Sequence, residues 1–206
     1  MGVYDELSEL GSATVYEASG REGLVDADLV QVIPGSRAAG PARTVRCAQG
    51  DNLMVHAVME RVEPGDVLVL TMPEPEPVAL IGELLATQAH AHGAAAMLVD
   101  ASVRDVEELR ELGLPVWARW VRVRGADKAV PGSLDEPVSV GGAEIRPGDA
   151  VVLDTDGAVV VRHERLDEVL AASRERAQRE VEKRAKLAAG AISYDLDGLR
   201  KIVDGE

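Results

Sequence analysis

Aromatic residues are scarce in this chain of 206 residues, where they make up 2% of the sequence and phenylalanine does not occur. The hydrophobic fraction of 46% comes almost wholly from alanine, valine and leucine. Such side chains pack well within sheets and against helices, so we expect a single domain, residues 1–206, with a real core. They offer no platform on which nucleic-acid bases could stack.

Positive charge is also in short supply. The chain has 22 lysine and arginine residues against 36 aspartate and glutamate residues, a formal net charge of −14. An acidic protein repels phosphate backbones and anionic membranes, so we expect neither nucleic acid nor a membrane as a partner. Small anionic substrates are not excluded, because one arginine or a bound metal ion can reverse the field inside a cleft.

Cysteine occurs once, as Cys47, so no intrachain disulfide can form. This usage is typical of a reducing cytoplasm. The N-terminus has no basic segment followed by an apolar run, so no signal peptide is predicted. No stretch approaches the roughly 18 uninterrupted apolar residues of a membrane span. We therefore expect a cytoplasmic protein.

Strands and helices alternate along the first part of the chain. Hydrophobic periodicity and the placement of glycine and proline predict these elements. Helices are expected at residues 3–20, 51–62, 80–92 and 103–112, and strands at 29–33, 43–47, 67–70, 94–99 and 116–121. This alternation predicts a mostly parallel α/β layer.

The pattern changes from Pro131 onward. Short strands joined by glycine-rich turns are expected at residues 138–140, 144–145, 150–153 and 158–161, where they favour a small β-barrel or sandwich. A long charged helix is expected at 166–189, with a solvated or interfacial surface. Residues 166–206 therefore form a C-terminal helical extension of the domain.

Two acidic residues and one arginine are candidates for chemistry. Glu83 begins a predicted helix, and Arg104 and Asp105 follow a predicted buried strand. Ligands of α/β sheets bind at such carboxyl ends of strands, and two carboxylates could hold a hard cation through oxygen. Two simpler interpretations stand beside this one. Glu83 could merely stabilise a helix start, and Arg104 and Asp105 could be a solvated pair.

The surrounding motifs resemble a known family. GELLAT at residues 82–87, with Arg104-Asp105 downstream, is similar to the 4-hydroxy-4-methyl-2-oxoglutarate / 4-carboxy-4-hydroxy-2-oxoadipate aldolases, which belong to the regulator of ribonuclease E activity A (RraA-like) family. The resemblance extends over nearly the whole chain. Further matching motifs are GSATVYEA at 11–18, GDNLMVHA at 50–57, PGS at 131–133, RPGD at 146–149 and DTDG at 154–157.

The resemblance implies a swivelling β/β/α domain, assembled into trimers or hexamers with active sites between subunits. It also implies a class II aldolase, which cleaves a 4-hydroxy-2-oxo acid to pyruvate and an oxo acid with the help of Mg²⁺ or Mn²⁺. Oxaloacetate decarboxylation should accompany cleavage, because both reactions pass through the same enolate.

The resemblance also implies roles for individual residues. Asp105 would be the direct metal ligand, Glu83 would hold metal-bound waters, and Arg104 would bind the pyruvyl carbonyl and the enolate oxygen. The pyruvyl carboxylate would bind at the helix start after Gly82, on the backbone N–H groups of Leu84 and Leu85. The remaining matching positions would line the site or complete it from a neighbouring subunit: Glu17, Asn52, His56 and Glu180, with Glu182 as the rival of Glu180.

Enolate chemistry needs either a Schiff-base lysine or a Lewis-acid metal. Three of the four lysines lie in the charged C-terminal region, and only Lys128 lies elsewhere, in a predicted loop. The metal route is therefore favoured. Two alternatives stay open: a non-catalytic regulator that binds a protein, as the namesake of the family does, and an enzyme of this scaffold that acts on another 2-oxo acid.

Overall fold

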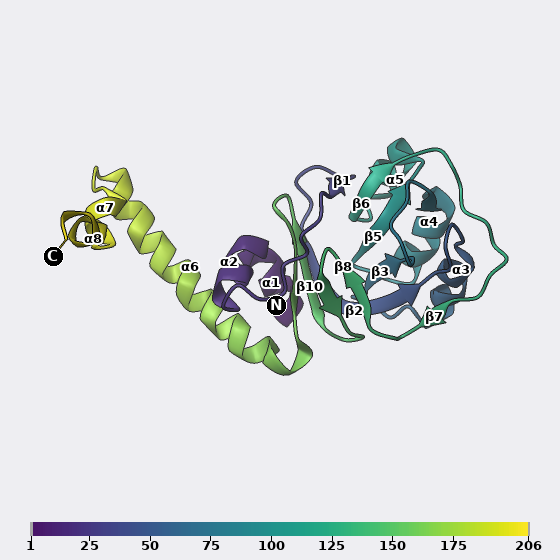
Figure 1. Ribbon diagram of the computed structural model, residues 1–206, viewed down its shortest axis with the longest axis horizontal. Coiled ribbons are helices and arrows are strands. Elements are labelled where there is room, and N and C mark those ends of the chain that lie inside the picture. The colour runs from purple at the N-terminus through teal and green to yellow at the C-terminus, as the bar shows by residue number, and fades with distance from the viewer. Residues whose placement is uncertain (1, 206) are drawn as a thin grey trace.

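The computed structural model describes residues 2–205, which form an α/β body with a long helix that extends from one side (Figure 1). The body is built on a nine-stranded sheet with the order β1-β6-β5-β3-β2-β10-β11, in which β4 also pairs with β5 and β7 with β2. The strands are β1 Val30–Gln31, β2 Ala38–Arg46, β3 Val67–Thr71, β4 Ala79–Ile81, β5 Ala96–Val103, β6 Val116–Val121, β7 Ser133–Leu134, β10 Ala150–Asp154 and β11 Gly157–Val161.

The centre of the sheet is parallel. The pairs β2–β3, β3–β5, β4–β5 and β5–β6 run in the same direction, whereas β1, β7, β10 and β11 pair in antiparallel fashion. Every residue of β3 and β5 is buried. Parallel strands read as continuous apolar runs when both faces of the sheet are covered, which explains why these two segments show no alternation.

Different layers cover the two faces. On one face the helices α3 Leu53–Val58, α4 Glu83–Ala91 and α5 Val106–Leu112 pack over Leu68 and Leu70 of β3. On the other face Val67 and Val69 pack against the curled strands β10 and β11 and against a separate hairpin. This hairpin consists of β8 Val138–Val140 and β9 Ala143–Ile145.

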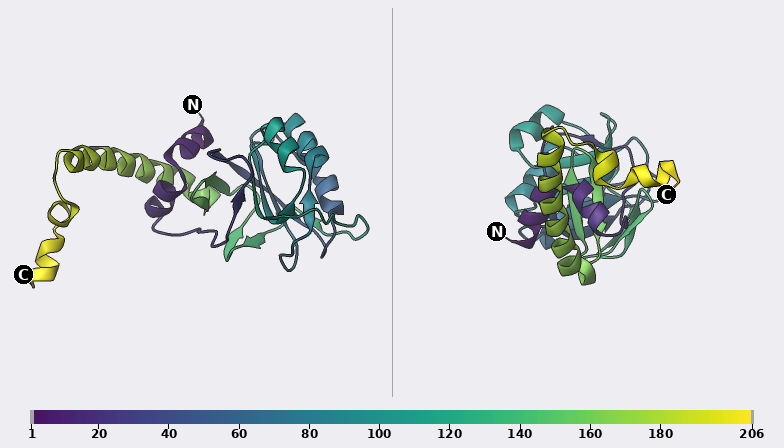
Figure 2. Two further views of the ribbon diagram at one scale, coloured as in Figure 1. Left: turned by 90° about the horizontal axis from the view of Figure 1, so that it is seen from above. Right: turned by 90° about the vertical axis from the view of Figure 1, so that its left-hand side faces the viewer.

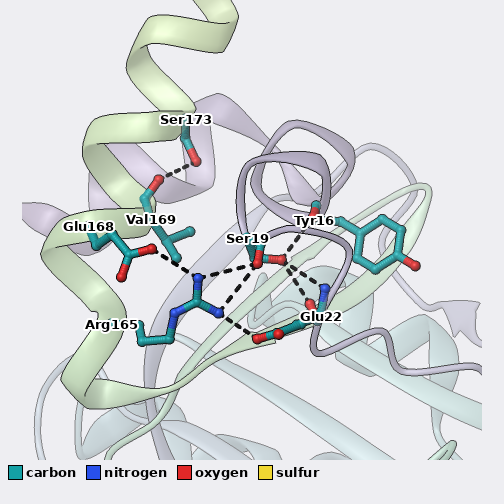
Figure 3. Close-up of polar contacts among 7 residues, drawn as sticks. All are labelled: Tyr16, Ser19, Glu22, Arg165, Glu168, Val169 and Ser173. Carbon is teal, nitrogen blue, oxygen red and sulfur yellow. Dashed lines mark hydrogen bonds and ion pairs between the residues drawn. The ribbon is translucent and has the colours of Figure 1, made fainter.

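A third layer lies outside the curled edge of the sheet. Apolar residues of β10 and β11 pack there against three helices: α1 Val3–Leu10, α2 Ser12–Ala18 and α6 Leu166–Ala188. Arg165 anchors the start of α6 to the end of α2 (Figure 3). It donates to the carbonyl of Ser19, to Glu22 and to Glu168.

Only the first part of α6 is buried against the body. The rest of the helix and the short helices α7 Ser193–Leu196 and α8 Leu199–Asp204 extend away from it (Figure 2). Apolar side chains on this arm are open to solvent; Ile202 and Val203 are 77% and 72% exposed. The predicted long, charged helix is thus present. Within residues 2–205, no helix has the length and apolarity needed to cross a membrane.

The predicted α/β class and the β/β/α architecture are confirmed, but the strands after Pro131 do not form a small β-barrel or sandwich of their own. β10 pairs with β2 and extends the main sheet, so only β8 and β9 stand apart. The reason lies in contacts between distant segments: Val152 of β10 lies opposite Ala39 of β2. The spacing of apolar residues along the sequence does not indicate which distant strand will be the partner.

Several predicted element ends also need correction. Residues 80 and 81 belong to strand β4, because both side chains are buried beside β5, and the helix begins at Glu83. β5 continues to Val103, so the next helix begins only at Val106. The helix expected from residue 51 begins at Leu53 and, after Val58, tightens into a 3-10 turn, Met59–Arg61.

Candidate active site

The predicted site residues meet where β4 and β5 end. Because these strands are parallel, their carboxyl ends lie at the same edge of the sheet, and the backbone N–H of Arg104 donates to the carbonyl of Ile81 at 3.2 Å. A cavity of about 160 Å³ opens at this edge. The residues around it that bear on chemistry are Asn52, His56, Gly82, Arg104, Asp105 and Lys128.

Asp105 is held in an unusual backbone conformation. Its φ of 59° and ψ of 49° lie in the left-handed region, which aspartate tolerates better than most residues. Its Oδ2 atom accepts a hydrogen bond from the backbone N–H of Glu83 at 3.1 Å. The conformation therefore turns the carboxylate of Asp105 toward the start of α4, and such strained residues are concentrated at functional sites.

Gly82 makes room for this carboxylate. Its φ of −141° is open to any residue, but a Cβ atom added there would lie 2.2 Å from Oδ2 of Asp105. The glycine is thus required by the close approach of Asp105 rather than by its own backbone conformation.

Arg104 lies beside Asp105 with half of its side chain exposed. Its Nε atom is 3.6 Å from Oδ2 of Asp105. The guanidinium also lies over Gly125, where an added Cβ would be 3.0 Å from Nη1. The planar group is therefore flanked on one side by a carboxylate and on another by bare backbone, while the rest of it faces the cavity.

The first turn of α4 offers free hydrogen-bond donors. Within residues 2–205, no protein acceptor is present for the backbone N–H groups of Leu84 and Leu85, and both residues line the cavity. Unpaired N–H groups at a helix start, together with the helix dipole, bind anions. The predicted carboxylate-binding position is therefore open and faces the cavity.

The Glu83 carboxylate lies to one side of the cavity. It accepts a hydrogen bond from the Thr87 hydroxyl at 2.9 Å, one turn along α4. Its backbone N–H, not its side chain, contacts Asp105. The role implied by the resemblance, in which this carboxylate holds metal-bound waters, stays a prediction.

Asn52, the residue before α3, and His56 on α3 both lie at the cavity. The buried Asn52 donates from Nδ2 to the carbonyl of Leu80 at 2.8 Å, and its Oδ1 has no partner among the described residues. Partial burial lowers the pKa of His56 below its ordinary value, and the positive charge of Lys128 lowers that pKa further. The imidazole is therefore neutral near pH 7.

Lys128 is the functional candidate whose position the sequence did not reveal. It lies in a loop, as expected, and this loop brings it to the cavity next to α3. The connection is made by Asp51, whose Oδ2 accepts from the backbone N–H of Ala129 at 2.6 Å and of Val130 at 3.0 Å. These contacts join segments 78 and 79 residues apart, and no local spacing signals them.

Two other predicted site residues lie elsewhere in the chain. Glu17 is on α2 and Glu180 on α6, and both helices lie on the other side of β10 from α4 and α5 (Figure 1). Both face Arg176, whose Nη1 is 3.8 Å from Glu17 and whose Nε is 3.0 Å from Glu180. Neither carboxylate belongs to the cavity of its own chain, so either could reach such a cavity only in another copy.

The residues at the edge of the sheet fit a hard cation that keeps much of its water. Asp105 offers an oxygen atom that accepts no hydrogen bond from residues 2–205, and Glu83 stands nearby. Magnesium is commonly held by one or two carboxylates with waters in the other positions. Within the described part of the chain, no group of three or more histidine, cysteine, aspartate or glutamate side chains could enclose a metal ion.

Comparison with known proteins identifies the family of this chain. The sequence model of a family described as "RraA-like: Aldolase/RraA" matches residues 5–160. The chain is 36% identical over 147 residues to a Halalkalibacterium halodurans protein named "Putative 4-hydroxy-4-methyl-2-oxoglutarate aldolase", an alignment that covers 71% of this chain and 70% of the relative.

Two solved structures have the same fold. An uncharacterized protein from Pseudomonas syringae superposes with a TM-score of 0.82 at 24% identity, covering 92% of this chain and 90% of that one. RraAS2 of Streptomyces coelicolor, described as an unusual member of the RNase ES inhibitor RraA protein family, superposes with a TM-score of 0.75 at 31% identity, covering 88% and 95%. The family match over residues 5–160 and the 36% identical relative together show that this chain belongs to the aldolase/RraA family.

Proposed function

We propose that the protein is a carbon–carbon lyase, a class II aldolase that releases pyruvate from 4-hydroxy-2-oxo acids. The observation that carries this proposal is the convergence of three groups on one cavity: the Asp105 carboxylate, the Arg104 guanidinium and the free N–H groups of α4. The name of the Halalkalibacterium halodurans relative supports the same reaction class.

The pyruvyl half of the substrate carries a carboxylate and a carbonyl, and the cavity has a partner for each. The N–H groups of Leu84 and Leu85 bind the carboxylate at the start of α4. Arg104 binds the carbonyl oxygen, where negative charge grows as the carbon–carbon bond breaks. An arginine placed in advance stabilises this charge more strongly in the transition state than in the bound substrate.

Asp105 would hold Mg²⁺ or Mn²⁺, with Glu83 acting through water, and the bound ion would supply Lewis-acid stabilisation of the developing enolate. The hydrogen bond from the Glu83 N–H fixes one oxygen of Asp105 and leaves the other for the ion. Asn52 and His56 line the part of the cavity toward which the hydroxyl-bearing half extends. Loss of CO₂ from oxaloacetate needs the same enolate, so the enzyme also decarboxylates oxaloacetate.

The proposal includes a cytoplasmic homo-oligomer, a trimer or a hexamer. Glu17 and Glu180 lie far from the cavity of their own chain, while the C-terminal arm exposes apolar side chains. Exposed apolar surface of this kind marks interaction sites. A neighbouring copy would bring Glu180 to the cavity and complete the cation site; Glu182 is the rival in this role.

The alternative is a regulator that binds another protein. The description of the Streptomyces coelicolor relative, at 31% identity, favours it. A regulator would have no need for an open arginine, free helix N–H groups and the Asn52–His56 pair around one cavity. The geometry therefore supports the enzyme.

Release of pyruvate tests the proposal directly. The purified protein is incubated with Mg²⁺ or Mn²⁺ and either 4-hydroxy-4-methyl-2-oxoglutarate or oxaloacetate, and pyruvate is followed with lactate dehydrogenase and NADH. We expect turnover with both compounds. Absence of pyruvate release from either compound with either ion would overturn the assignment and favour the regulator.

A further inference from the structure

A β-bulge interrupts β5 shortly before this strand reaches the site. Between the pairs Val99–Ala118 and Ser102–Trp120, β5 has two residues and β6 has one. A bulge of this kind bends the strand and re-aims the residues that follow it, and bulges are frequent next to active sites. The bulge in β5 therefore determines where Arg104 leaves the sheet.

The neighbour of β5 on its other side changes at the same place. β3 is paired with β5 as far as Val99, and β4 takes over at Ser102. The two residues of the bulge, Asp100 and Ala101, thus fall outside the pairs that β5 forms with β3, β4 and β6. Regular backbone pairing does not fix the register of β5 at this point.

The apolar pattern of this segment also specifies the register weakly. A register is set mainly by apolar side chains that fit only one face of the sheet. Residues 100–102 are aspartate, alanine and serine, all of them buried, and only Val103 is a larger apolar residue. A slip of β5 by one residue, roughly 3.3 Å, would displace Arg104 and Asp105 from the start of α4.

One side-chain contact distinguishes the two residues of the bulge. Arg119, the residue of β6 that lies opposite them, donates from Nε to Oδ1 of Asp100 at 2.6 Å. The side chain of Asp100 is 5% exposed and that of Arg119 is 20% exposed. Because Ala101 has no acceptor in its side chain, this ion pair is lost if β5 slips. A buried carboxylate without its partner is strongly unfavourable, so the pair selects one register.

The ion pair lies outside the cavity and on the other face of the sheet from α4. Side chains alternate along a strand, and Ala101 and Val103 belong to the core beneath the helices α3, α4 and α5. Asp100 therefore points to the opposite face, and neither Asp100 nor Arg119 lines the cavity. These two residues can influence the site only through the backbone of β5, which leads to Arg104.

We propose that Asp100 and Arg119 are positioning residues, whose ion pair fixes the register of β5 at the bulge and so places Arg104 and Asp105 at the start of α4. The effect on catalysis rests on the proposed aldolase function, whereas the fixed register is a property of the fold alone. Selection of one arrangement among several is the best attested role of a buried polar or ionic group.

Amide hydrogen exchange tests the fixed register without any substrate. Beyond the bulge, the N–H of Ser102 donates to the carbonyl of Val78 at 3.0 Å, and the N–H of Arg104 donates to the carbonyl of Ile81 at 3.2 Å. In Arg119→Met, these two amides should exchange at least about tenfold faster, because β5 can then open locally. The amides of β3 should keep their wild-type rates.

Ser102→Ala is the matched control. It changes a fully buried polar side chain of the same strand, whose hydroxyl has no partner in residues 2–205, and it should leave the exchange of the Arg104 amide unchanged. If Arg119→Met does not fold, the double variant Asp100→Asn/Arg119→Met takes its place, since it leaves no unpaired buried charge. Wild-type exchange at Arg104, or an equal rise over all strands, would overturn the control of register.

The kinetics of pyruvate release distinguish positioning from a general loss of stability. The N–H groups that bind the substrate carboxylate belong to α4, so Arg119→Met should change KM by less than about threefold. It should lower kcat of the folded protein about 10²-fold, the usual cost of a displacement of about 1 Å. Asp100→Asn keeps an acceptor oxygen for Arg119, so it should retain most of the kcat that Asp100→Ala loses.

Two results would contradict the proposal or its basis, and they differ. A folded Arg119→Met protein with wild-type kcat would show that the ion pair does not position Arg104. A wild-type protein that releases no pyruvate would instead overturn the aldolase function, and the exchange rates of the Ser102 and Arg104 amides would still show whether the pair fixes the register.

Discussion

The backbone N–H of Glu83 donates to Oδ2 of Asp105 at 3.1 Å and so ties the start of α4 to the turn that precedes α5. This bond connects the two strand ends that form the site. Since Gly82 leaves just enough room for the carboxylate, the position of Asp105 is set by its own left-handed backbone, by one hydrogen bond and by one missing side chain.

Substitution of Gly82→Ala should therefore remove activity without unfolding the protein. The new Cβ would lie 2.2 Å from Oδ2, so Asp105 must move and lose its bond to Glu83, while the backbone φ of −141° suits alanine. Displacement of a reacting group by about 1 Å can cost on the order of 10²-fold in rate. Steady-state kinetics and circular dichroism would measure both effects. Gly2→Ala is the control, because its added Cβ meets only Asp5 at an ordinary distance of 3.4 Å.

Substitution of Arg104→Ala should lower kcat by about 10²–10³ for both aldol cleavage and oxaloacetate decarboxylation, since one preorganised donor is lost from the transition state. Arg104→Lys should recover only part of this loss, because an ammonium group lacks the planar fork. The fold should survive, as half of the Arg104 side chain is exposed. Arg122→Ala is the control, because the Arg122 side chain is exposed and, within residues 2–205, donates only to the carbonyl of Val121. A folded Arg104→Ala enzyme with wild-type kcat would remove Arg104 from the mechanism.

Chelation with EDTA should abolish activity, and Mg²⁺ or Mn²⁺ should restore it, because the Asp105 carboxylate is proposed to bind the ion directly and the Glu83 carboxylate through water. Borohydride added during turnover should not inactivate the enzyme, as the metal route forms no Schiff base. Full activity in EDTA, together with labelling of Lys128 by borohydride, would show instead that this lysine is the nucleophile. Mass spectrometry of the labelled protein distinguishes the two routes.

Mixed oligomers test whether the site is shared between copies. Arg104→Ala and Glu180→Ala chains are co-expressed with different tags and purified together. If Glu180 completes the site of a neighbour, roughly a quarter of the sites should combine an intact Arg104 with an intact Glu180 from the other chain. Activity should therefore exceed that of either single variant. Glu182→Ala is the matched control and should be active alone. Mixed oligomers no more active than their parents would place Glu180 outside the site.

The pKa of His56, which lies at the cavity, should be lower than the ordinary pKa of histidine. Burial lowers the pKa of His56, and Lys128 lowers it further, so Lys128→Met should raise this pKa part of the way back toward 6.5. The folded state binds this proton less readily than the unfolded state. The free energy of unfolding should therefore fall as pH drops through 6.5 toward the pKa of His56 in the folded state. NMR titration of the imidazole in both proteins measures the shift. An unchanged pKa in Lys128→Met would show that the two groups do not interact.

The sequence predicted those parts of the site that depend on local pattern. The helix that carries Glu83 and the buried run that precedes Arg104 and Asp105 are recognisable in one chain, although the helix was expected from residue 80 and begins at Glu83. The position of Lys128 was not predictable in this way. It depends on a hydrogen bond between the Asp51 carboxylate and the backbone N–H of Ala129, which are 78 residues apart in the sequence. The sequence does not distinguish a buried acidic residue that binds backbone N–H groups from a solvated one.

The pairing of strands at the edge of the sheet was likewise not predictable from the sequence. β10 and β11 were correctly expected as strands, but their partner was not, because register between distant strands is set by side-chain packing and not by spacing. Similarly, Leu80 and Ile81 fit a helical period and a strand equally well. Both residues belong to strand β4 because their side chains are buried beside β5, and this burial arises only when the chain folds.

The length of α6 has a consequence for activity at low protein concentration. A helix of 23 residues is about 35 Å long. Because only its first part packs on its own body, it carries Glu180 outward and holds it at a distance from the cavity of the same chain. If that carboxylate serves a neighbour, a dissociated chain has an incomplete site however well it is folded. Specific activity should then fall as the enzyme is diluted, and the concentration at half-maximal activity would report the strength of assembly.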